Sequence, residues 1–281
     1  MNRHERLTTL LELLAERESL AVEDAAELLG VSTATVRRDM DHLAQQQLLV
    51  RTHGGAVAGN VSYDLPLRYK TARHAEEKGR IGQAAARLVQ AGMVVGLNGG
   101  TTTTEAARAI ALRGDSGSGG PGSGGSGSGS GEGPGDGRGG EGWTATIVTN
   151  ALNIASELTV RPRIRVVVTG GVAREKSYEL IGPLAGHILE EVTLDLMFLG
   201  VDALHHTLGA TAHHEVEAST NRLMASRARK VVVLADSSKL DRSAFARICH
   251  VREIHMVITD SGAPDEVVQP FQEQGVEVVR V

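Results

Sequence analysis

The fold of the N-terminal part of this chain is decided by residues 31–57, which read "VSTATVRRDMDHLAQQQLLVRTHGGAV". Ser32 is typical of a helix N-cap. The apolar side chains of Val36, Met40 and Leu43 then recur at helical spacing. A short apolar run and a Gly-Gly turn follow. The stretch therefore predicts a helix that begins after Ser32, followed by a small β element.

The residues upstream predict two further helices. Residues 4–16 place four leucines at helical spacing, so that one face is apolar. Residues 22–30 form a second, short helix that Gly30 ends, and "SLAV" at 19–22 is an extended link between the two. The expected order of elements is that of a winged helix-turn-helix: a helix, a short helix, a turn, a third helix and a β turn.

A helix of this kind presents its N-terminal residues to base edges in the DNA major groove. If the apolar residues pack inward, Thr33, Arg37 and Arg38 face outward, where arginine can bind guanine or phosphate. The helix N-terminus itself favours a phosphate. In the alternative, the two arginines lie on a solvated face and are screened by Asp39 and Asp41. The predicted DNA-binding residues are Ser32, Thr33, Thr35, Arg37, Arg38, Arg51, His53 and Gly54.

The charge of this part of the chain is not that of a strong DNA binder. Residues 1–75 hold nine Lys and Arg against ten Asp and Glu, and the whole chain carries a net charge of −5. Non-specific attraction to DNA is then weak. Specific affinity for double-stranded operator DNA needs two copies on a symmetric site, so we expect a homo-oligomer, either a dimer or a tetramer.

The rest of the chain alternates apolar runs with helical patterns. Continuous Val, Ile and Leu runs between helices predict a mostly parallel sheet covered on both faces. The expected fold is therefore an α+β winged helix-turn-helix head at 1–58, a linker at 59–75 and a larger α/β domain at 76–281. The runs are at 93–97, 144–149, 164–171, 194–202, 230–236, 254–260 and 276–281.

A glycine-rich segment interrupts the α/β domain. Residues 114–142 contain 16 glycines and lie between an expected helix at 101–112 and an expected strand at 144–149. Lengthening a closed loop costs little free energy. We predict that this segment is a disordered insertion in one connection, that it carries no site, and that it is not the domain boundary.

A second glycine motif, "NGGTTTT" at 98–104, follows the apolar run at 93–97 and opens a helix. Gly99 and Gly100 let the backbone approach a ligand closely. The threonines present hydroxyl and N–H groups at a helix N-terminus, which suits an anion such as phosphate. The alternative is an ordinary helix cap without a ligand.

Residues 31–57 resemble the DNA-binding part of the DeoR-type transcriptional regulators, whose pattern is VS-x-x-T-[IV]-RRDL and then a wing that ends R-x-HGGA. The matching residues are Val31, Ser32, Thr35, Val36, Arg37, Arg38, Asp39, Arg51, His53, Gly54, Gly55 and Ala56, with Met40 in place of the usual Leu.

The C-terminal part resembles the sensor domain of the same family, because the family's motifs occur in order along it. The matching residues are Gly100, Thr101, Thr102, Val148, Thr149, Asn150, Gly170, Gly171, Asp195, Phe198, Gly200, Glu217, Ala218, Arg222, Met224, Asp236, Ser238, Lys239, Ile258, Thr259 and Asp260.

The resemblance implies a sensor domain that is related in fold to ribose-5-phosphate isomerase. It also implies that this sensor domain binds a phosphorylated sugar effector. Asn98 stands where the family commonly has an acid, and Asn221 where many members have Lys, so Lys239 is the best remaining cation. In the alternatives, Lys239 is a solvated loop residue, Asp202 a strand-end cap and Glu217 part of a solvated helix face. The predicted effector-binding residues are Asn98, Gly99, Gly100, Thr101, Thr102, Thr103, Asn150, Gly171, Asp202, Glu217 and Lys239.

The remaining chemistry-bearing residues favour no metal or cofactor. Adjacent histidines point apart on a strand or helix, so the pairs at 205–206 and 213–214 each offer at most one ligand to a given site. Cys249, the only cysteine, excludes an internal disulfide and is expected to be buried. No apolar run reaches 18 residues and no signal peptide is evident, so we expect a cytoplasmic protein without a membrane partner.

These observations favour a transcriptional regulator, by resemblance a repressor of carbohydrate genes that a phosphorylated sugar relieves. The alternative is an enzyme, a sugar-phosphate isomerase or deaminase that uses Asp202 or Glu217 as the base. A DNA-reading head is not needed for catalysis and argues against that alternative. A third hypothesis is a scaffold protein with a degenerate sensor.

Overall fold

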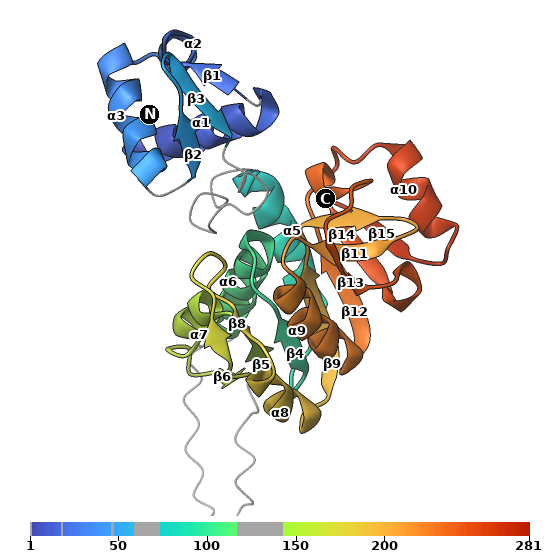
Figure 1. Ribbon diagram of the computed structural model, residues 1–281. Coiled ribbons are helices and arrows are strands. Elements are labelled where there is room, and N and C mark those ends of the chain that lie inside the picture. Colours follow the sequence, from blue (N-terminus) through green and yellow to red (C-terminus); the bar gives the residue numbers. More distant parts are fainter. Residues whose placement is uncertain (1, 18, 46–47, 59–73, 117–142) are drawn as a thin grey trace, which may run out of the picture. The chain divides into compact units, whose positions relative to one another are not determined.

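The computed structural model describes residues 2–17, 19–45, 48–58, 74–116 and 143–281 (Figure 1). They form two compact units, Met1–Ala75 with Glu175–Ser177, and Glu76–Arg174 with Tyr178–Val281. Most of the predicted linker at 59–75 and of the insertion at 114–142 lies outside the described residues. Where the start of the insertion is described, the helix continues to Ser116, beyond its expected end at 112.

In its described residues, the head has three helices and a small antiparallel sheet of order β1-β3-β2. The elements are α1 (Arg3–Arg17), β1 (Ser19–Ala21), α2 (Val22–Leu29), α3 (Thr33–Gln45), β2 (Leu49–Arg51) and β3 (Gly55–Ala58). Val36, Met40 and Leu43 are fully buried, as the spacing predicts. Gly30, with φ of 63°, ends α2 in the left-handed conformation that glycine favours.

The link predicted at 19–22 is in fact mostly strand. Residues 19–21 form β1, which pairs with β3, and Ala21 lies opposite Gly55. A Cβ atom on Gly55 would lie 2.1 Å from the carbonyl oxygen of Leu20. Only glycine therefore allows β1 to approach the wing this closely, and three residues are too few to show strand periodicity in the sequence.

The larger unit is built on a seven-stranded sheet of order β15-β14-β12-β9-β4-β5-β6, in which every neighbouring pair is parallel. This confirms the predicted α/β class. Its strands are β4 (Val94–Leu97), β5 (Ala145–Thr149), β6 (Ile164–Val168), β9 (Leu194–Gly200), β12 (Ala228–Leu234), β14 (Met256–Thr259) and β15 (Glu277–Arg280).

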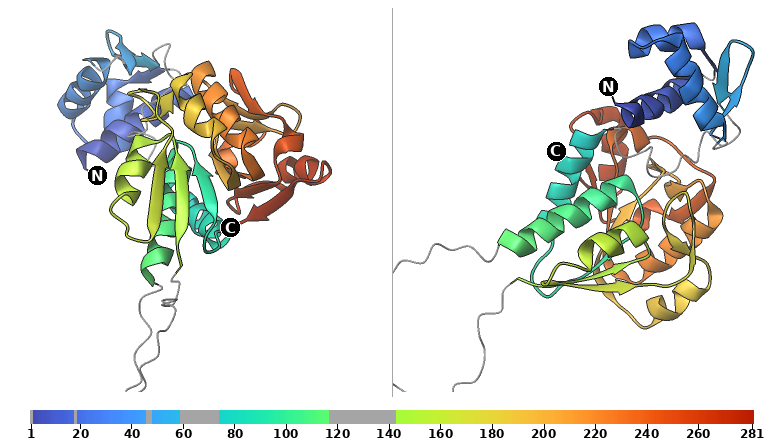
Figure 2. Two further views of the ribbon diagram at one scale, coloured as in Figure 1. Left: turned by 90° about the horizontal axis from the view of Figure 1, so that it is seen from below. Right: turned by 90° about the vertical axis from the view of Figure 1, so that its left-hand side faces the viewer.

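Helices cover both faces of this sheet and bury a separate apolar cluster on each (Figure 2). One face carries α5 (Ala75–Arg87), α6 (Thr101–Ser116) and α7 (Leu152–Leu158). The other carries α8 (Leu184–Glu190), α9 (Glu215–Ser226) and α10 (Asp265–Gln272). The strands are apolar on both sides because both sides are covered, and their sequences therefore lack an alternating pattern.

Smaller elements flank the main sheet. The hairpin of β7 (Val172–Ala173) and β8 (Leu180–Ile181) lies beyond β6 in the chain. A three-stranded antiparallel sheet is formed by β10 (Ala203–His205), β11 (Gly209–Ala212) and β13 (Ala246–Cys249). Short 3-10 helices lie at Ser237–Lys239 and Val251–Glu253. Cys249 is buried in the apolar cluster, as expected, and burial raises the pKa of its thiol to about 12.

The order of the main sheet reverses between β4 and β9. The chain runs from β4 to β5 and β6 on one side, and then begins again on the other side of β4 with β9, β12, β14 and β15. Ligands of open parallel sheets bind at the carboxyl ends of the strands at such a reversal. Asn98 joins the two strand ends there, because its Nδ2 donates to the Gly200 oxygen (3.0 Å) and its Oδ1 accepts from the Gly200 N–H (2.7 Å).

Candidate functional site

The solvent-facing side of α3 is where the sequence places the DNA contacts. Thr33, Arg37 and Arg38 are exposed. The Arg37 guanidinium lies 3.8 Å from the Glu23 carboxylate, and both side chains are more than half exposed, so this pair is weak and easily exchanged. The apolar face is buried and the arginines are accessible, which is what insertion into a groove requires.

Ser32 caps α3. Its carbonyl oxygen accepts from the N–H groups of Thr35 and Val36. Its hydroxyl oxygen accepts from the Thr35 N–H (3.2 Å) and lies 2.9 Å from the Thr35 hydroxyl. Two of the predicted DNA-binding residues therefore first serve to fix the start of the helix.

The idea that Asp39 and Asp41 screen the exposed arginines is wrong. Asp39 is buried and accepts a 2.5 Å hydrogen bond from the Arg6 side chain of α1, with Arg3 at 3.7 Å. Asp41 pairs with Arg51 instead (2.9 Å). The sequence could not show this, because Arg6 and Asp39 are 33 residues apart.

The wing residues have two different environments. The Arg51 guanidinium binds Asp41 of α3 and donates to the carbonyl oxygen of Gly55 (2.5 Å), so it ties α3 to the wing. Its side chain is only 29% exposed. His53 and Gly54 are exposed at the turn between β2 and β3. Of the three predicted wing contacts, Arg51 is thus already engaged within the head.

In the larger unit, the predicted anion loop lies at the sheet reversal. Gly99 and Gly100 follow β4, and α6 begins at Thr101. The hydroxyls of Thr103 and Thr104 donate to the Gly100 oxygen at 3.1 and 2.6 Å. The backbone N–H groups of Thr101–Thr103 have no backbone acceptor among the described residues. They are the orphan donors that an anion at a helix N-terminus uses.

Glu179, which the sequence analysis did not single out, lies against this loop. It immediately precedes β8 and is only 2% exposed. Its Oε1 accepts from the Gly99 N–H at 2.7 Å. A Cβ atom on Gly99 would lie 2.4 Å from the Glu179 Cγ, so glycine is required for this contact. The two residues are 80 positions apart, and no motif connects them.

A chain of carboxamides extends from Glu179 into the unit. Asn221 of α9 donates to the Glu179 Oε1 (3.4 Å), and Asn150, after β5, donates to the Asn221 Oδ1 (3.3 Å). The Oδ1 of Asn150 is buried without a hydrogen-bond partner in the described part of the chain. A buried acceptor of this kind is costly unless a donor reaches it. The structure thus brings Gly99, Asn150 and Asn221 into one polar cluster.

The same cluster is rich in carboxyl groups. Burial, and then the negative charges of Glu217 and Asp202, raise the pKa of Glu179 to a net value of about 8, against the lowering effect of hydrogen bonds from the Gly99 N–H and Asn221. Glu217, on α9, is buried and pairs with Arg174 at 3.0 Å. It is therefore not on a solvated helix face, and Arg174 is a cation that the sequence analysis missed.

The other predicted effector residues have more local roles. Asp202 accepts from the backbone N–H of His213 (3.0 Å), which agrees with a strand-end cap. Gly171 has φ of 126°, and a Cβ there would lie 2.8 Å from the Ile181 oxygen, so it allows the hairpin to close. Lys239 is half-buried in the 3-10 helix that follows β12.

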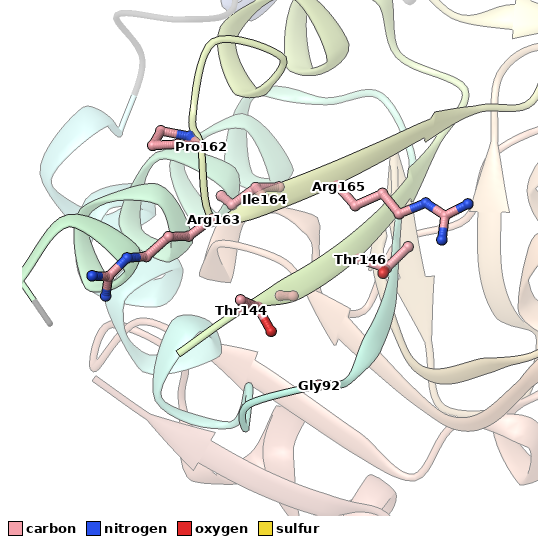
Figure 3. Close-up of a pocket in the computed structure, with 8 residues that line it drawn as sticks. Gly92, Thr144, Thr146, Pro162, Arg163, Ile164 and Arg165 are labelled. Atoms are coloured by element: carbon pink, nitrogen blue, oxygen red, sulfur yellow. The ribbon is translucent and has the colours of Figure 1, made fainter. Parts of the chain in front are cut away.

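A depression of about 330 Å³ lies at the opposite edge of the sheet, where β4, β5 and β6 begin (Figure 3). Figure 3 shows the Arg163 and Arg165 side chains extending in opposite directions, so they do not converge on a ligand. The depression is lined by Gly92, Thr144, Ala145, Thr146, Pro162, Arg163, Ile164 and Arg165. We therefore place the candidate ligand site at the carboxyl edge.

The expectation that each histidine pair supplies one ligand at most is wrong for His205 and His206. Their rings stack with centroids 4.4 Å apart, and both face Asp241, so that three potential ligand atoms lie within 4.8 Å of one another. However, the Nδ1 of His205 accepts from the Thr207 N–H (3.2 Å). The Nε2 of the same ring lies 3.4 Å from the Asp241 carboxylate.

Comparison with known proteins agrees with this division into a head and a sensor. The DeoR-like helix-turn-helix domain matches residues 6–60, and the DeoR C terminal sensor domain matches residues 141–261. The transcriptional regulator GlpR of Haloferax volcanii is 33% identical over 98% of this chain and 96% of its own length. The chain belongs to the DeoR family.

Other relatives of this DeoR-family protein are regulators as well. The glycerol-3-phosphate regulon repressor of Escherichia coli K12 is 26% identical, and 99% of each chain is covered. The transcriptional repressor GlcR of Bacillus subtilis is 28% identical over 92% of this chain and 89% of its own. The protein is a transcriptional regulator, and its relatives do not favour the enzyme alternative.

Solved structures match this DeoR-family protein only at low similarity. Ribose 5-phosphate isomerase A of Methanocaldococcus jannaschii has a TM-score of 0.40 at 18% identity, covering 59% of this chain and 54% of its own. The sorbitol operon regulator SorC of Klebsiella pneumoniae has a TM-score of 0.32 at 12% identity, covering 85% of this chain and 90% of its own.

In the described residues, no helix has the length and apolar composition that crossing a bilayer requires.

Proposed function

We propose that this regulator represses genes of carbohydrate metabolism by binding operator DNA, and that a phosphorylated sugar relieves the repression. The observation that carries the DNA half is α3, whose apolar face is fully buried while Thr33, Arg37 and Arg38 are exposed. A relative named for a glycerol-3-phosphate regulon supports the carbohydrate half. We place this function in the cytoplasm, with the chromosome, and assign it no metal or cofactor.

The proposed DNA contact uses α3 and the wing turn. Arg37 and Arg38 would reach guanine edges or phosphates in the major groove. Thr33, at the start of the helix, lies where recognition helices contact bases. His53 and Gly54 are exposed at the turn and would approach the backbone. Because the head has nearly balanced charge, we propose that two heads of a homo-oligomer bind a two-fold symmetric operator.

The proposed effector site is the polar cluster at the sheet reversal. The loop Asn98–Thr103 offers backbone donors to a phosphate. The buried Asn150 and Asn221 amides and the Glu217 carboxylate offer groups that hydrogen-bond sugar hydroxyls. An effector relieves repression only if it binds better to the conformation with weak DNA affinity, since equal affinity for both conformations shifts no equilibrium.

The DNA half is tested by footprinting the full chain on its own promoter region at several salt concentrations. Arg37→Ala is expected to weaken binding by roughly 1–3 kcal/mol and to reduce the salt dependence by about one phosphate contact. Arg17→Ala, an exposed arginine at the end of α1, is the matched control and leaves binding unchanged. Equal footprints for all three proteins contradict the proposed use of α3.

The effector half is tested by a thermal-shift screen that includes ribose 5-phosphate and glucosamine 6-phosphate. A ligand at 100 times its Kd adds about 2.7 kcal/mol of stability by linkage. A shift with a phosphosugar, and none with the unphosphorylated sugar, supports the proposal. Turnover of either compound by the purified chain would instead support the enzyme alternative.

A further inference from the structure

The Glu179 carboxyl sits where the glycine loop would receive an anion. Its Oε1 accepts from the Gly99 N–H at 2.7 Å, immediately before the helix N-terminus at Thr101. The side chain is buried, and its Cγ takes the space that a Cβ on Gly99 would fill. The loop therefore already binds one acidic group, which comes from the protein itself.

A phosphate and this carboxyl cannot share the loop without cost. Both accept from the Gly99 N–H, and one donor cannot satisfy two acceptors fully. Glu217 and Asp202 place negative charge near Glu179, which also opposes a phosphate. The Arg174 guanidinium is paired with Glu217 at 3.0 Å.

We propose that Glu179 is an internal competitor of the effector, occupying the Gly99 end of the anion loop so that a phosphate binds fully only when this carboxyl is displaced. The inference rests on the proposed effector site and adds what regulates its affinity. Displacement of the Glu179 carboxyl frees the Gly99 N–H for the phosphate and breaks the hydrogen bond between Glu179 and Asn221.

The neighbouring side-chain amides indicate which hydrogen bond can form once the Glu179 carboxyl is displaced. Asn221 donates to Glu179 through a long contact of 3.4 Å, which is easily exchanged. The Asn150 Oδ1 is buried with no partner in the described structure. A ligand hydroxyl that enters beside them would satisfy the Asn150 acceptor, which has no partner among the described residues. The competitor thus favours a ligand that has hydroxyl groups as well as phosphate.

The main chain around Glu179 limits the displacement to its side chain. Leu180 donates to the Asn150 oxygen (2.6 Å) and Leu152 donates to the Tyr178 oxygen (2.9 Å), so the backbone on both sides of Glu179 is tied to the segment after β5. A rotation about the side-chain bonds of Glu179 then releases Gly99 while β8 stays in place.

The test measures the Kd of inorganic phosphate for the full chain by calorimetry. Glu179→Ala removes the competing acceptor and is expected to tighten binding by about tenfold. Glu179→Gln keeps a neutral acceptor for the Gly99 N–H, so a smaller gain or none is expected. Glu157→Gln is the control, because Glu157 is a partly exposed carboxylate of α7 that pairs with Arg108. Circular dichroism of each sample confirms that the variants are folded.

The outcomes separate this inference from the proposed function. Tighter binding by Glu179→Ala, with a smaller gain or none in Glu179→Gln, supports the competitor. Equal Kd values in all four proteins overturn it and leave the effector site intact. Weaker binding by Glu179→Ala also overturns it, since Glu179 is then a ligand contact. No binding by any protein overturns both the inference and the phosphate part of the proposed effector site.

Discussion

At the scale of single residues, the head depends on a buried ion pair. The Asp39 side chain is 4% exposed and that of Arg6 is 13% exposed, and they join α3 to α1 at 2.5 Å. A buried pair of this kind contributes little over an apolar pair, but loss of one partner leaves a buried charge uncompensated. The position of the recognition helix therefore depends on a residue that does not face DNA.

Asp39→Ala is expected to destabilise the head by about 3 kcal/mol, because Arg6 loses its partner in a buried environment. Urea unfolding followed by circular dichroism measures the change. Asp41→Ala is the control, since Asp41 is 58% exposed, and its loss should cost less than about 1 kcal/mol. Similar losses in both variants would show that burial of Asp39 contributes nothing.

Glu179 gives the sensor a pH-dependent stability. Its pKa is raised from 4.5 to about 8, and the charged groups around it are Glu217, Asp202 and, paired with Glu217, Arg174. The folded state therefore binds a proton that the unfolded state releases between these pH values. The stability that the neutral carboxyl contributes is complete below pH 4.5 and is lost as the pH rises through 8.

Glu179→Gln is expected to abolish this loss, because glutamine stays neutral. At pH 9 the variant should be more stable than the wild-type protein by up to the order of 4 kcal/mol, and the difference should shrink toward pH 5. Urea unfolding at pH 5, 7 and 9 measures it. A constant difference across this range would contradict a buried, neutral Glu179.

At the scale of elements, the close packing of β1 on the wing sets the geometry of the head. A Cβ atom on Gly55 would overlap the backbone of Leu20, whereas one on the adjacent Gly54 would meet no atom within 4 Å. The two glycines of the HGG turn thus have different roles. Gly55 permits strand pairing, and Gly54 is open to solvent.

Gly55→Ala is therefore expected to destabilise the head by about 3 kcal/mol, since backbone atoms must shift. Gly54→Ala should change the stability by less than about 0.5 kcal/mol. Thermal unfolding of the two variants decides between these values. A tolerated Gly55→Ala would mean that β1 does not pair with β3 as closely as described.

At the scale of the whole molecule, the two functions must be linked energetically. If an effector lowers the affinity for DNA by some factor, DNA must lower the affinity for the effector by the same factor, because coupling free energies are reciprocal. We expect a phosphosugar found in the thermal-shift screen to lower operator affinity by about 5- to 150-fold. Titrations of the phosphosugar with and without operator DNA measure both factors, and unequal factors would contradict a simple two-state coupling.

Local patterns predicted much of the fold. The spacing of Val36, Met40 and Leu43 fixed the buried face of α3, and apolar runs between helices indicated a parallel sheet. The glycine and threonine loop was placed correctly at a strand-to-helix junction. These features depend on neighbours within a few positions of the chain, which is the range that periodicity and capping describe.

The amino-acid sequence alone determined the helices α1, α2 and α3, the seven strands of the main sheet, which face of α3 is exposed, and to which family the motifs are similar. Only the tertiary structure decided that Asp39 binds Arg6, that Asp41 binds Arg51, and that Glu179 occupies the loop at Gly99. The physical reason is that a hydrogen bond or ion pair depends on distance in space. Residues 80 positions apart in the chain meet only after the whole sheet has assembled.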